Sequence, residues 1–228
     1  MEIRGRPLAT VDVAMFAVRD SALQVLLVRR PQGPGEPFPG RWALPGGFVD
    51  VDRDADLEAC ALRKLREKTG IDAPYLEQVG TWGGARRDPR GWSTTHVYFA
   101  LVPADELPQP APDAQWHAVD TAQKLSLAFD HAALLAAAVE RLRGKVEYTS
   151  LPAFLLPREF TLSELQRAYE TILGRELEKS AFRTRILATD LVVAVPRRRE
   201  GPNRPAQLYR LRSRREPVFF QRTFKPAG

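Results

Sequence analysis

The first forty residues contain two apolar stretches, a short polar break between them and a loop-forming segment. Residues 8–18 (LATVDVAMFAV) and 23–29 (LQVLLVR) are rich in strand-favouring side chains, and Arg19–Asp20–Ser21 separates them. Residues 31–40 (PQGPGEPFPG) hold the prolines and glycines that are typical of loops. The pattern predicts two strands joined by a tight turn and followed by a loop.

Helical and extended patterns alternate in the next hundred residues. A helix is expected over residues 54–68, where Leu57, Ala61 and Leu65 share one face, and another over residues 129–143, which Asp130 is placed to cap. Strands are expected at YLEQVGTW (75–82) and THVYFALV (95–102), on either side of the polar loop GGARRDPRGWS. Strands, helix, strands and helix in this order predict an α/β/α sandwich.

A domain boundary is expected between residues 144 and 160, where Gly144, Pro152 and Pro157 interrupt regular structure. The chain then continues as FTLSELQRAYETILG, in which Thr161 and Glu164 have the spacing of a capping box. The apolar stripe of this helix consists of Leu162, Leu165, Tyr169 and Ile172, and Gly174 is placed to end it. We therefore expect domains at residues 1–148 and 149–228.

The second domain has the outline of a winged helix-turn-helix. A second helix is expected at residues 179–188, with Phe182 and Ile186 on one face and Ser180 and Thr184 opposite. The apolar segments LVVAV and AQLYRLR then flank the basic turn PRRREGPNRP, as the two strands of a wing would. In such a motif the second helix enters the major groove of DNA.

Charge is unevenly distributed between the two parts. Residues 150–228 hold 16 Lys/Arg against 8 Asp/Glu, a net charge of +8, whereas residues 1–149 have a net charge of −2. A basic module beside a near-neutral one favours an anionic polymer as partner, most simply nucleic acid, although a basic solvated surface is the plain alternative.

Several other classes of protein are disfavoured by composition. No run approaches 18 apolar residues, so no membrane span is expected, and the N-terminal MEIRGRPLATVDV has no apolar signal segment, which favours the cytoplasm. The single cysteine, Cys60, sits on an apolar helical face and is expected to be a buried, inert thiol. Three histidines without a Cys/His cluster make a zinc site improbable.

Residues 44–71 (LPGGFVDVDRDADLEACALRKLREKTGI) look like a damaged Nudix box. The family's core is Arg-Glu-apolar-x-Glu-Glu-x-Gly, and here lysines stand at the first and third glutamate positions, as Lys64 and Lys68, around Glu67. These three positions share one helical face, and an ammonium group cannot ligate Mg²⁺. From Gly47 to Arg63 is 16 positions, two more than the family spacing, and the upstream glutamate has no clear counterpart. The nearby acids are Asp52, Asp54, Asp56 and Glu58. The box therefore indicates binding of a nucleotide rather than its hydrolysis, with no metal expected.

Basic and short polar side chains on the second helix and wing are candidates for DNA contact. The guanidinium groups of Arg183 and Arg185 can each bond two guanine acceptors, and Ser180 and Thr184 are short enough to face the groove. Phosphate or minor-groove contacts are expected from Lys179, Arg197, Arg198, Arg199 and Arg204. Ordinary solvated helix and turn residues are the alternative for each arginine.

Both halves together resemble the NrtR family of Nudix-related transcriptional regulators. The resemblance rests on RWALPGGFV, LAFDH at 127–131, and FTLSELQRAYETILGREL followed by FRTRILAT. It implies a homodimeric repressor of NAD biosynthesis and salvage genes that binds a palindromic operator. It also implies an effector, ADP-ribose or a related NAD metabolite, and no required cofactor. Members differ in effector, and some control sugar catabolism instead.

The expected effector site gathers residues from four segments. The loop that contains Arg87 and Arg90 could hold a pyrophosphate, the glycine pair lets a phosphate approach closely, and Lys64 and Lys68 could do the work of a cation. Trp42, Trp82 or Phe129 could stack on adenine, although core packing is the better reading of Trp82. Asp130 is expected to be a helix cap first and a ligand contact second. The expected ligand-binding residues are Arg41, Trp42, Gly46, Gly47, Lys64, Glu67, Lys68, Arg87, Arg90, Phe129 and Asp130.

Two other functions remain compatible with the residues. One is an active ADP-ribose or nucleotide pyrophosphatase with a basic accessory domain, in which Asp54, Glu58 and Glu67 would hold one Mg²⁺. The other is an RNA-binding or ribosome-associated adaptor that uses the basic module without sequence preference.

Overall fold

The computed structural model describes residues 5–70, 75–107, 111–200 and 205–221, and a mixed seven-stranded sheet dominates the first part of the chain. Strands β1 (Leu8–Arg19), β2 (Ala22–Arg29), β3 (Trp42–Ala43), β6 (Ser93–Leu101) and β5 (Tyr75–Gly84) lie in the order β3-β2-β1-β6-β5. Strand β4 (Gly46–Phe48) pairs with β1, and β7 (Ala114–Ala118) pairs with β2. The pairing of β1 with β6 is parallel, and the other pairings in this sheet are antiparallel.

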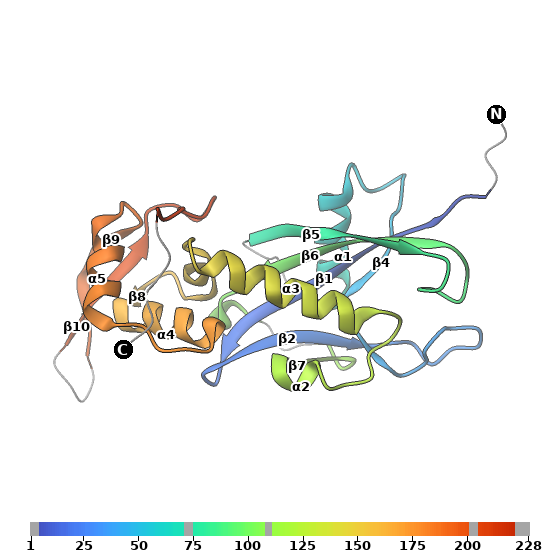
Figure 1. The fold of residues 1–228 in the computed structure, drawn as a ribbon, viewed down its shortest axis with the longest axis horizontal. Helices are drawn as coiled ribbons and strands as arrows, with labels where there is room; N and C mark the ends of the chain where they lie inside the picture. The colour runs from blue at the N-terminus through green and yellow to red at the C-terminus, as the bar shows by residue number, and fades with distance from the viewer. Residues whose placement is uncertain (1–4, 71–74, 108–110, 201–204, 222–228) are drawn as a thin grey trace.

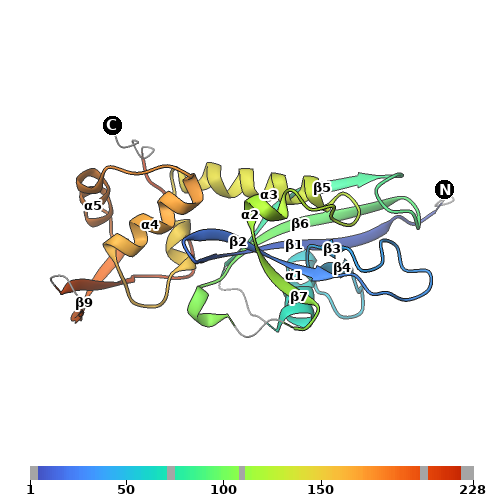
Figure 2. The same cartoon turned by 90° about the horizontal axis from the view of Figure 1, so that it is seen from below.

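Helices cover both faces of this sheet, as Figure 2 shows for α1 (Leu57–Thr69) and α3 (His131–Val146). Side chains of β1 alternate between two apolar clusters: Val11 and Val13 pack with α1, and Ala14 and Phe16 pack with α3. Because both faces are buried, the strand is apolar almost throughout. The short helices η1 (Ala104–Glu106) and α2 (Val119–Ala122) flank β7. The expected α/β/α sandwich is thereby confirmed.

The last third of the chain forms a small helical unit with a three-stranded sheet at one end of the elongated molecule (Figure 1). It contains η2 (Leu151–Leu155), α4 (Leu162–Leu173) and α5 (Lys179–Ala188), with β8 (Phe160–Thr161), β10 (Ala206–Leu211) and β9 (Val192–Arg199) in the sheet order β8-β10-β9. The capping box at Thr161 and Glu164 is present, and α4 ends at Gly174 in the left-handed conformation, as predicted.

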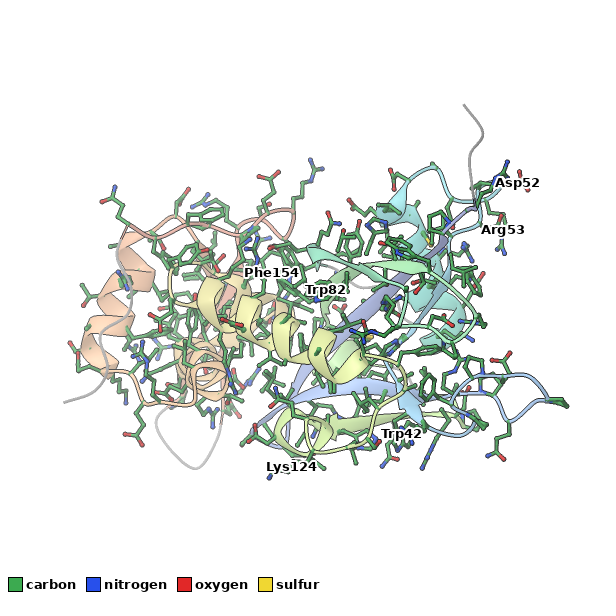
Figure 3. All side chains as sticks on the ribbon, turned by 45° about the vertical axis from the view of Figure 1, so that its right-hand side comes forward. Trp42, Asp52, Arg53, Trp82, Lys124 and Phe154 are labelled. Carbon is green, nitrogen blue, oxygen red and sulfur yellow. The ribbon has the colours of Figure 1, made fainter. Side chains whose placement is uncertain are left out.

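One apolar core runs from the large sheet into the helical unit. It includes Phe16 and Leu135 from the first part and Leu165 and Phe182 from the second. Phe154 of η2, labelled in Figure 3 where the two parts meet, is fully buried in this core. The helical unit therefore packs directly on the sheet domain.

The structure corrects four expectations about the elements. Helix α1 begins at Leu57, with Asp56 as its N-cap, and not at residue 54. Gly144 lies inside α3 and does not interrupt it. Strand β9 continues to Arg199, so the basic segment begins as strand rather than as turn. Asp130 occupies the N-cap position of α3 without forming a side-chain capping bond, because Arg87 holds its carboxylate.

Candidate functional site

A cleft of about 250 Å³ opens at one edge of the large sheet, and the glycine pair of the Nudix-like box lies in its wall. Its lining comes from strands β1 to β4, the loop at 30–36, helix α1, the loop at 87–90 and the start of α3. The lining residues that sequence reasoning anticipated are Gly46, Gly47, Lys64, Lys68, Arg87, Arg90 and Phe129. The structure thus brings together most of the expected ligand site.

The floor of the cleft is set by the pairing of β4 with β1. Gly46 lies opposite Asp12, and a Cβ at Gly46 would lie 2.1 Å from Asp12 Oδ1 and 2.5 Å from the Val11 carbonyl oxygen. The backbone N–H of Leu44 donates to His131 Nδ1 at 2.9 Å, which ties the glycine loop to the start of α3. Thr95 Oγ1 donates to Asp12 Oδ2 at 2.7 Å. Asp12 and His131 are both buried and both line the cleft, and the sequence reading missed them.

Arginines and aromatic rings form one wall of the cleft. The guanidinium of Arg30 lies 5.1 Å from the Phe129 ring centroid, and that of Arg90 lies 4.8 Å from the ring of Phe48. Phe129 adopts a left-handed φ of 51°, which few non-glycine residues adopt, and its ring stacks on His131 at 5.4 Å. This arrangement offers cations beside an aromatic face, the chemistry that a nucleotide requires.

Carboxylates hold these two arginines and the nearby Arg87 in place. Arg87 donates to both oxygens of Asp130, at 2.9 and 3.0 Å, and Arg30 pairs with Glu36 at 2.5 Å. Arg90 donates to both oxygens of the buried Asp88. Burial opposes ionisation of Asp88, but the hydrogen bonds from the Arg90 side chain and backbone prevail, so the Asp88 pKa lies below its usual range. These contacts fix the side chains of Arg87 and Arg90 in position along the cleft.

Helix α1 presents its two lysines to the cleft, whereas arginines engage its glutamate. Lys64 and Lys68 line the cleft, whereas Glu67 is not among the lining residues and pairs with Arg63 at 3.1 Å and with Arg53 at 3.3 Å. Arg63 also binds both oxygens of Asp54, each at 2.6 Å. Among the described residues no group of three or more His, Cys, Asp or Glu side chains is placed to hold a metal ion.

Arg41 and Trp42 do not reach the cleft, contrary to expectation. They line a separate hollow, where Arg41 donates to Ser126 Oγ at 3.0 Å and the Arg29 guanidinium lies 3.9 Å from the Trp42 ring. The reason is the pleat of β3, because its next residue, Ala43, faces the cleft and Trp42 therefore faces away. Trp82 is half-buried against the main core and is not among the cleft residues, in keeping with a packing role.

The outer face of α5 carries the expected DNA-contacting side chains. Phe182 and Ile186 are buried, whereas the side chains exposed on this helix include Lys179, Ser180, Arg183, Thr184 and Leu187. Leu187 is 52% exposed, an apolar residue on this face that the sequence reading did not single out. Arg185 lies on the other flank from Arg183, half-buried, with its guanidinium 5.6 Å from the Phe220 ring.

The wing arginines differ in their surroundings. Arg197 pairs with Glu159 at 2.5 Å, and Arg199 pairs with Glu164 of the α4 capping box. Arg198, the residue between them on β9, is exposed. Arg204 lies outside the described residues.

Comparisons with known proteins agree with both halves of this arrangement. A family model of the NUDIX domain matches residues 8–138, and one of the NrtR DNA-binding winged helix domain matches residues 152–211. The chain thus joins a Nudix domain to a DNA-binding winged helix. It belongs to the NrtR family of Nudix-related transcriptional regulators, which confirms the resemblance seen in the sequence.

Two of the similar proteins cover nearly the whole chain, and a third covers its Nudix part. The "ADPR responsive transcriptional repressor NtrR" of Acinetobacter baylyi is 51% identical over 207 residues, which are 90% of this chain and 82% of the relative. The crystal structure of Shewanella oneidensis NrtR complexed with a 27mer DNA has a TM-score of 0.88 at 39% identity, covering 95% of this chain and 99% of that one. The NUDIX domain of the same protein, complexed with ADP ribose, has a TM-score of 0.55 at 42% identity, covering 61% of this chain and 90% of that one.

No helix in the described part of the chain has the length and apolar character that a membrane span requires.

Proposed function

We propose that this protein is a transcriptional repressor whose winged helix binds operator DNA and whose cleft binds ADP-ribose or a related NAD metabolite that changes its affinity for DNA. One observation carries the proposal. A cleft lined by lysines and arginines and a basic winged helix belong to two parts of the chain that share one continuous apolar core. Relatives described as an ADPR responsive repressor and as NrtR complexed with DNA or with ADP ribose support it.

Recognition of a palindromic operator requires two copies of the winged helix. A homodimer would present two α5 helices, and half-sites about 34 Å apart, or a multiple of that spacing, would match them. Genes of NAD biosynthesis are the targets that the effector chemistry favours, and the cytoplasm is the location that fits such a regulator. A ligand changes operator affinity only if it binds one arrangement of the dimer better than the other.

Hydrolysis of the bound nucleotide is not part of this function. Lys64 and Lys68 stand at two of the glutamate positions of the Nudix box, and Arg63 binds both Asp54 and Glu67. An ADP-ribose pyrophosphatase activity would require these acids to hold Mg²⁺ instead. Metal-dependent cleavage of ADP-ribose by the purified protein, abolished by Glu67→Gln, would support the pyrophosphatase in place of the repressor.

DNA binding is tested with a duplex selected from a random library by the full-length protein. Arg183→Ala is expected to weaken binding to that duplex by roughly 1–3 kcal/mol, because a bidentate contact to guanine is lost. Lys124→Ala, an exposed lysine on the Nudix part, is the matched control and should leave affinity unchanged. Unchanged affinity of Arg183→Ala would count against α5 as the reading helix.

Effector response is tested on the same duplex. Adding ADP-ribose is expected to raise the apparent Kd for the duplex, whereas if no NAD metabolite at millimolar concentration changes it, the effector assignment is wrong. If no duplex is preferred over random sequence and binding depends steeply on salt, an RNA or non-specific nucleic-acid role replaces the operator role.

A further inference from the structure

Helix α1 places two lysines on the cleft wall where the Nudix box would gather metal-binding glutamates. Lys64 and Lys68 are one helical turn apart, and both line the cleft. A Cβ built on Gly47 would lie 3.1 Å from Lys64 Cε and 3.2 Å from Lys64 Nζ, so the end of this side chain lies directly against the glycine loop. The side chain of Lys64 is 16% exposed. An ammonium group therefore already occupies the space beside the loop.

The acids that remain near this position do not fit a divalent cation. The Asp54 side chain is 1% exposed, and its strongest interaction is the hydrogen bonding from Arg63, which holds the Asp54 pKa well below its usual range. Glu67 accepts from the same arginine through both oxygens. Magnesium needs several oxygen ligands in a near-octahedral shell, and these two carboxylates are already bound to a guanidinium. The residues of this box therefore do not fit the cation that the Nudix fold implies.

The charges of the cleft are unequally compensated. Arg30, Arg87 and Arg90 each have a carboxylate within 2.9 Å. By contrast, the ion pair of Lys64 with Glu67 is long, at 3.6 Å, and Lys68 forms no ion pair within the described residues. The two lysines are thus cations in the cleft with charge left to neutralise an incoming anion. A diphosphate group supplies that anion, and both ammonium groups can donate charge-assisted hydrogen bonds to it.

We propose that the cleft binds a nucleotide diphosphate without a divalent cation, with the Lys64 and Lys68 ammonium groups neutralising the phosphates in place of the metal. The inference rests on the proposed function for the choice of ADP-ribose as the ligand. It adds that binding is metal-independent and that the same lysines repel Mg²⁺ from the position where a hydrolase holds it. A sensor of this kind responds to its ligand whatever the supply of divalent cation.

The first test measures ADP-ribose binding to the full-length protein by calorimetry, once in EDTA and once in millimolar Mg²⁺. The affinities are expected to agree within about twofold, since Mg²⁺ adds no protein contact and only weakly screens the phosphates. Binding that requires Mg²⁺, or improves about tenfold or more with it, overturns the proposal. Inorganic pyrophosphate serves as a second probe: if it binds in EDTA and ADP-ribose does not, the effector is wrong but the metal-free site stands. If neither probe binds in EDTA, the site itself is wrong.

The second test removes or reverses the charges of the two lysines. Lys64→Gln and Lys68→Gln should each weaken ADP-ribose binding in EDTA by roughly 10- to 100-fold, the factor for one charge-assisted hydrogen bond. The double variant Lys64→Glu/Lys68→Glu should lose binding in EDTA and regain part of it with Mg²⁺ or Mn²⁺. Lys124→Glu is the matched charge reversal at an exposed residue that does not line the cleft (Lys124 is labelled in Figure 3), and it should bind as the native protein does. Thermal melting checks that each variant is folded, and folded glutamine variants with native affinity would overturn the proposal.

Discussion

At the scale of single residues, the cleft depends on the absence of a side chain at Gly46. The Val11 carbonyl oxygen that a Cβ would approach to 2.5 Å belongs to the backbone of the central strand, so it cannot rotate aside. Gly46→Ala is expected to lower the free energy of unfolding by about 1–3 kcal/mol, as overpacking of a close contact does. The measurement is urea denaturation followed by circular dichroism.

The matched control for this substitution is Gly144→Ala. Gly144 lies inside α3 with open space where a Cβ would stand, so alanine should stabilise the helix by about 0.5–1 kcal/mol. Equal free energies of unfolding for Gly46→Ala and the native protein would contradict the close contact.

His131 makes the folded protein sensitive to mild acid. Burial lowers its pKa, with partial opposition from the charge of Asp12, and its Nδ1 accepts from Leu44. Because the unfolded chain binds this proton more readily, the stabilisation is complete above the unfolded-state pKa of about 6.5 and decreases as pH falls below it. The lowered pKa of the Asp88 carboxylate affects the free energy of unfolding only at more acidic pH, below about 4.

The free energy of unfolding should therefore decline between roughly pH 6.5 and 5 in the native protein, and less steeply in His131→Gln. Denaturant titrations at a series of pH values measure both slopes. His96→Gln, at a residue whose pKa burial also lowers but which is only partly buried, should flatten the decline less. If the free energy of unfolding of His131→Gln declined with pH as steeply as that of the native protein, other groups would cause the acid sensitivity.

At the scale of elements, strand β9 places its three consecutive arginines on alternate faces, because successive side chains of a strand point in opposite directions. All three are exposed, but Arg197 and Arg199 pair with Glu159 and Glu164, whereas the alternation of the strand places Arg198 on the other side. The logarithm of the DNA-binding constant falls linearly with the logarithm of the salt concentration. Arg198→Ala should make this slope shallower by about 1, the value for one phosphate contact. Arg197→Ala should change the slope less, and equal slopes for the two variants would contradict the assignment of the phosphate contact to Arg198.

The long helices and strands could be predicted from the sequence, whereas the shortest strands could not. The apolar run of β1 and the capping box of α4 are local signals, and both are present as predicted. The two- and three-residue strands β3 and β4 exist only because β2 and β1 offer them backbone partners, which no local pattern reveals. Misplacing Trp42 followed from missing β3, since the pleat of that strand decides which side chain faces the cleft.

Site residues that lie far apart in the sequence were harder to find than those within motifs. The glycine pair and the lysines of α1 belong to one recognisable box and do line the cleft. The one available signal for Asp12 was an acid within an otherwise apolar strand. The role of Asp130 could not be predicted, because its partner Arg87 is 43 positions away in sequence and takes the carboxylate that would otherwise cap α3.

At the scale of the whole molecule, the two parts are joined by polar contacts as well as by the shared core. Arg175 Nη2 donates to Glu147 Oε1 at 3.0 Å, and Arg143 Nε donates to the carbonyl oxygen of Ile172 at 3.1 Å. Both contacts are partly buried, so breaking the junction would expose polar groups and core side chains together. The boundary expected between residues 148 and 149 lies between the two matched family ranges and remains a prediction.

Because apolar and polar contacts cross the junction, the chain should unfold in a single cooperative transition. All four tryptophans lie between residues 42 and 116, so their fluorescence reports the Nudix part, and amide hydrogen exchange of α4 reports the winged helix. Both probes should give one denaturant midpoint. ADP-ribose at about 100 times its Kd should shift both together by about 2.7 kcal/mol, although it contacts only the cleft. A shift of the fluorescence midpoint without a matching shift in α4 would mean that the cleft and the DNA-binding unit are energetically independent, and ligand control of operator binding would then require a route other than the shared core.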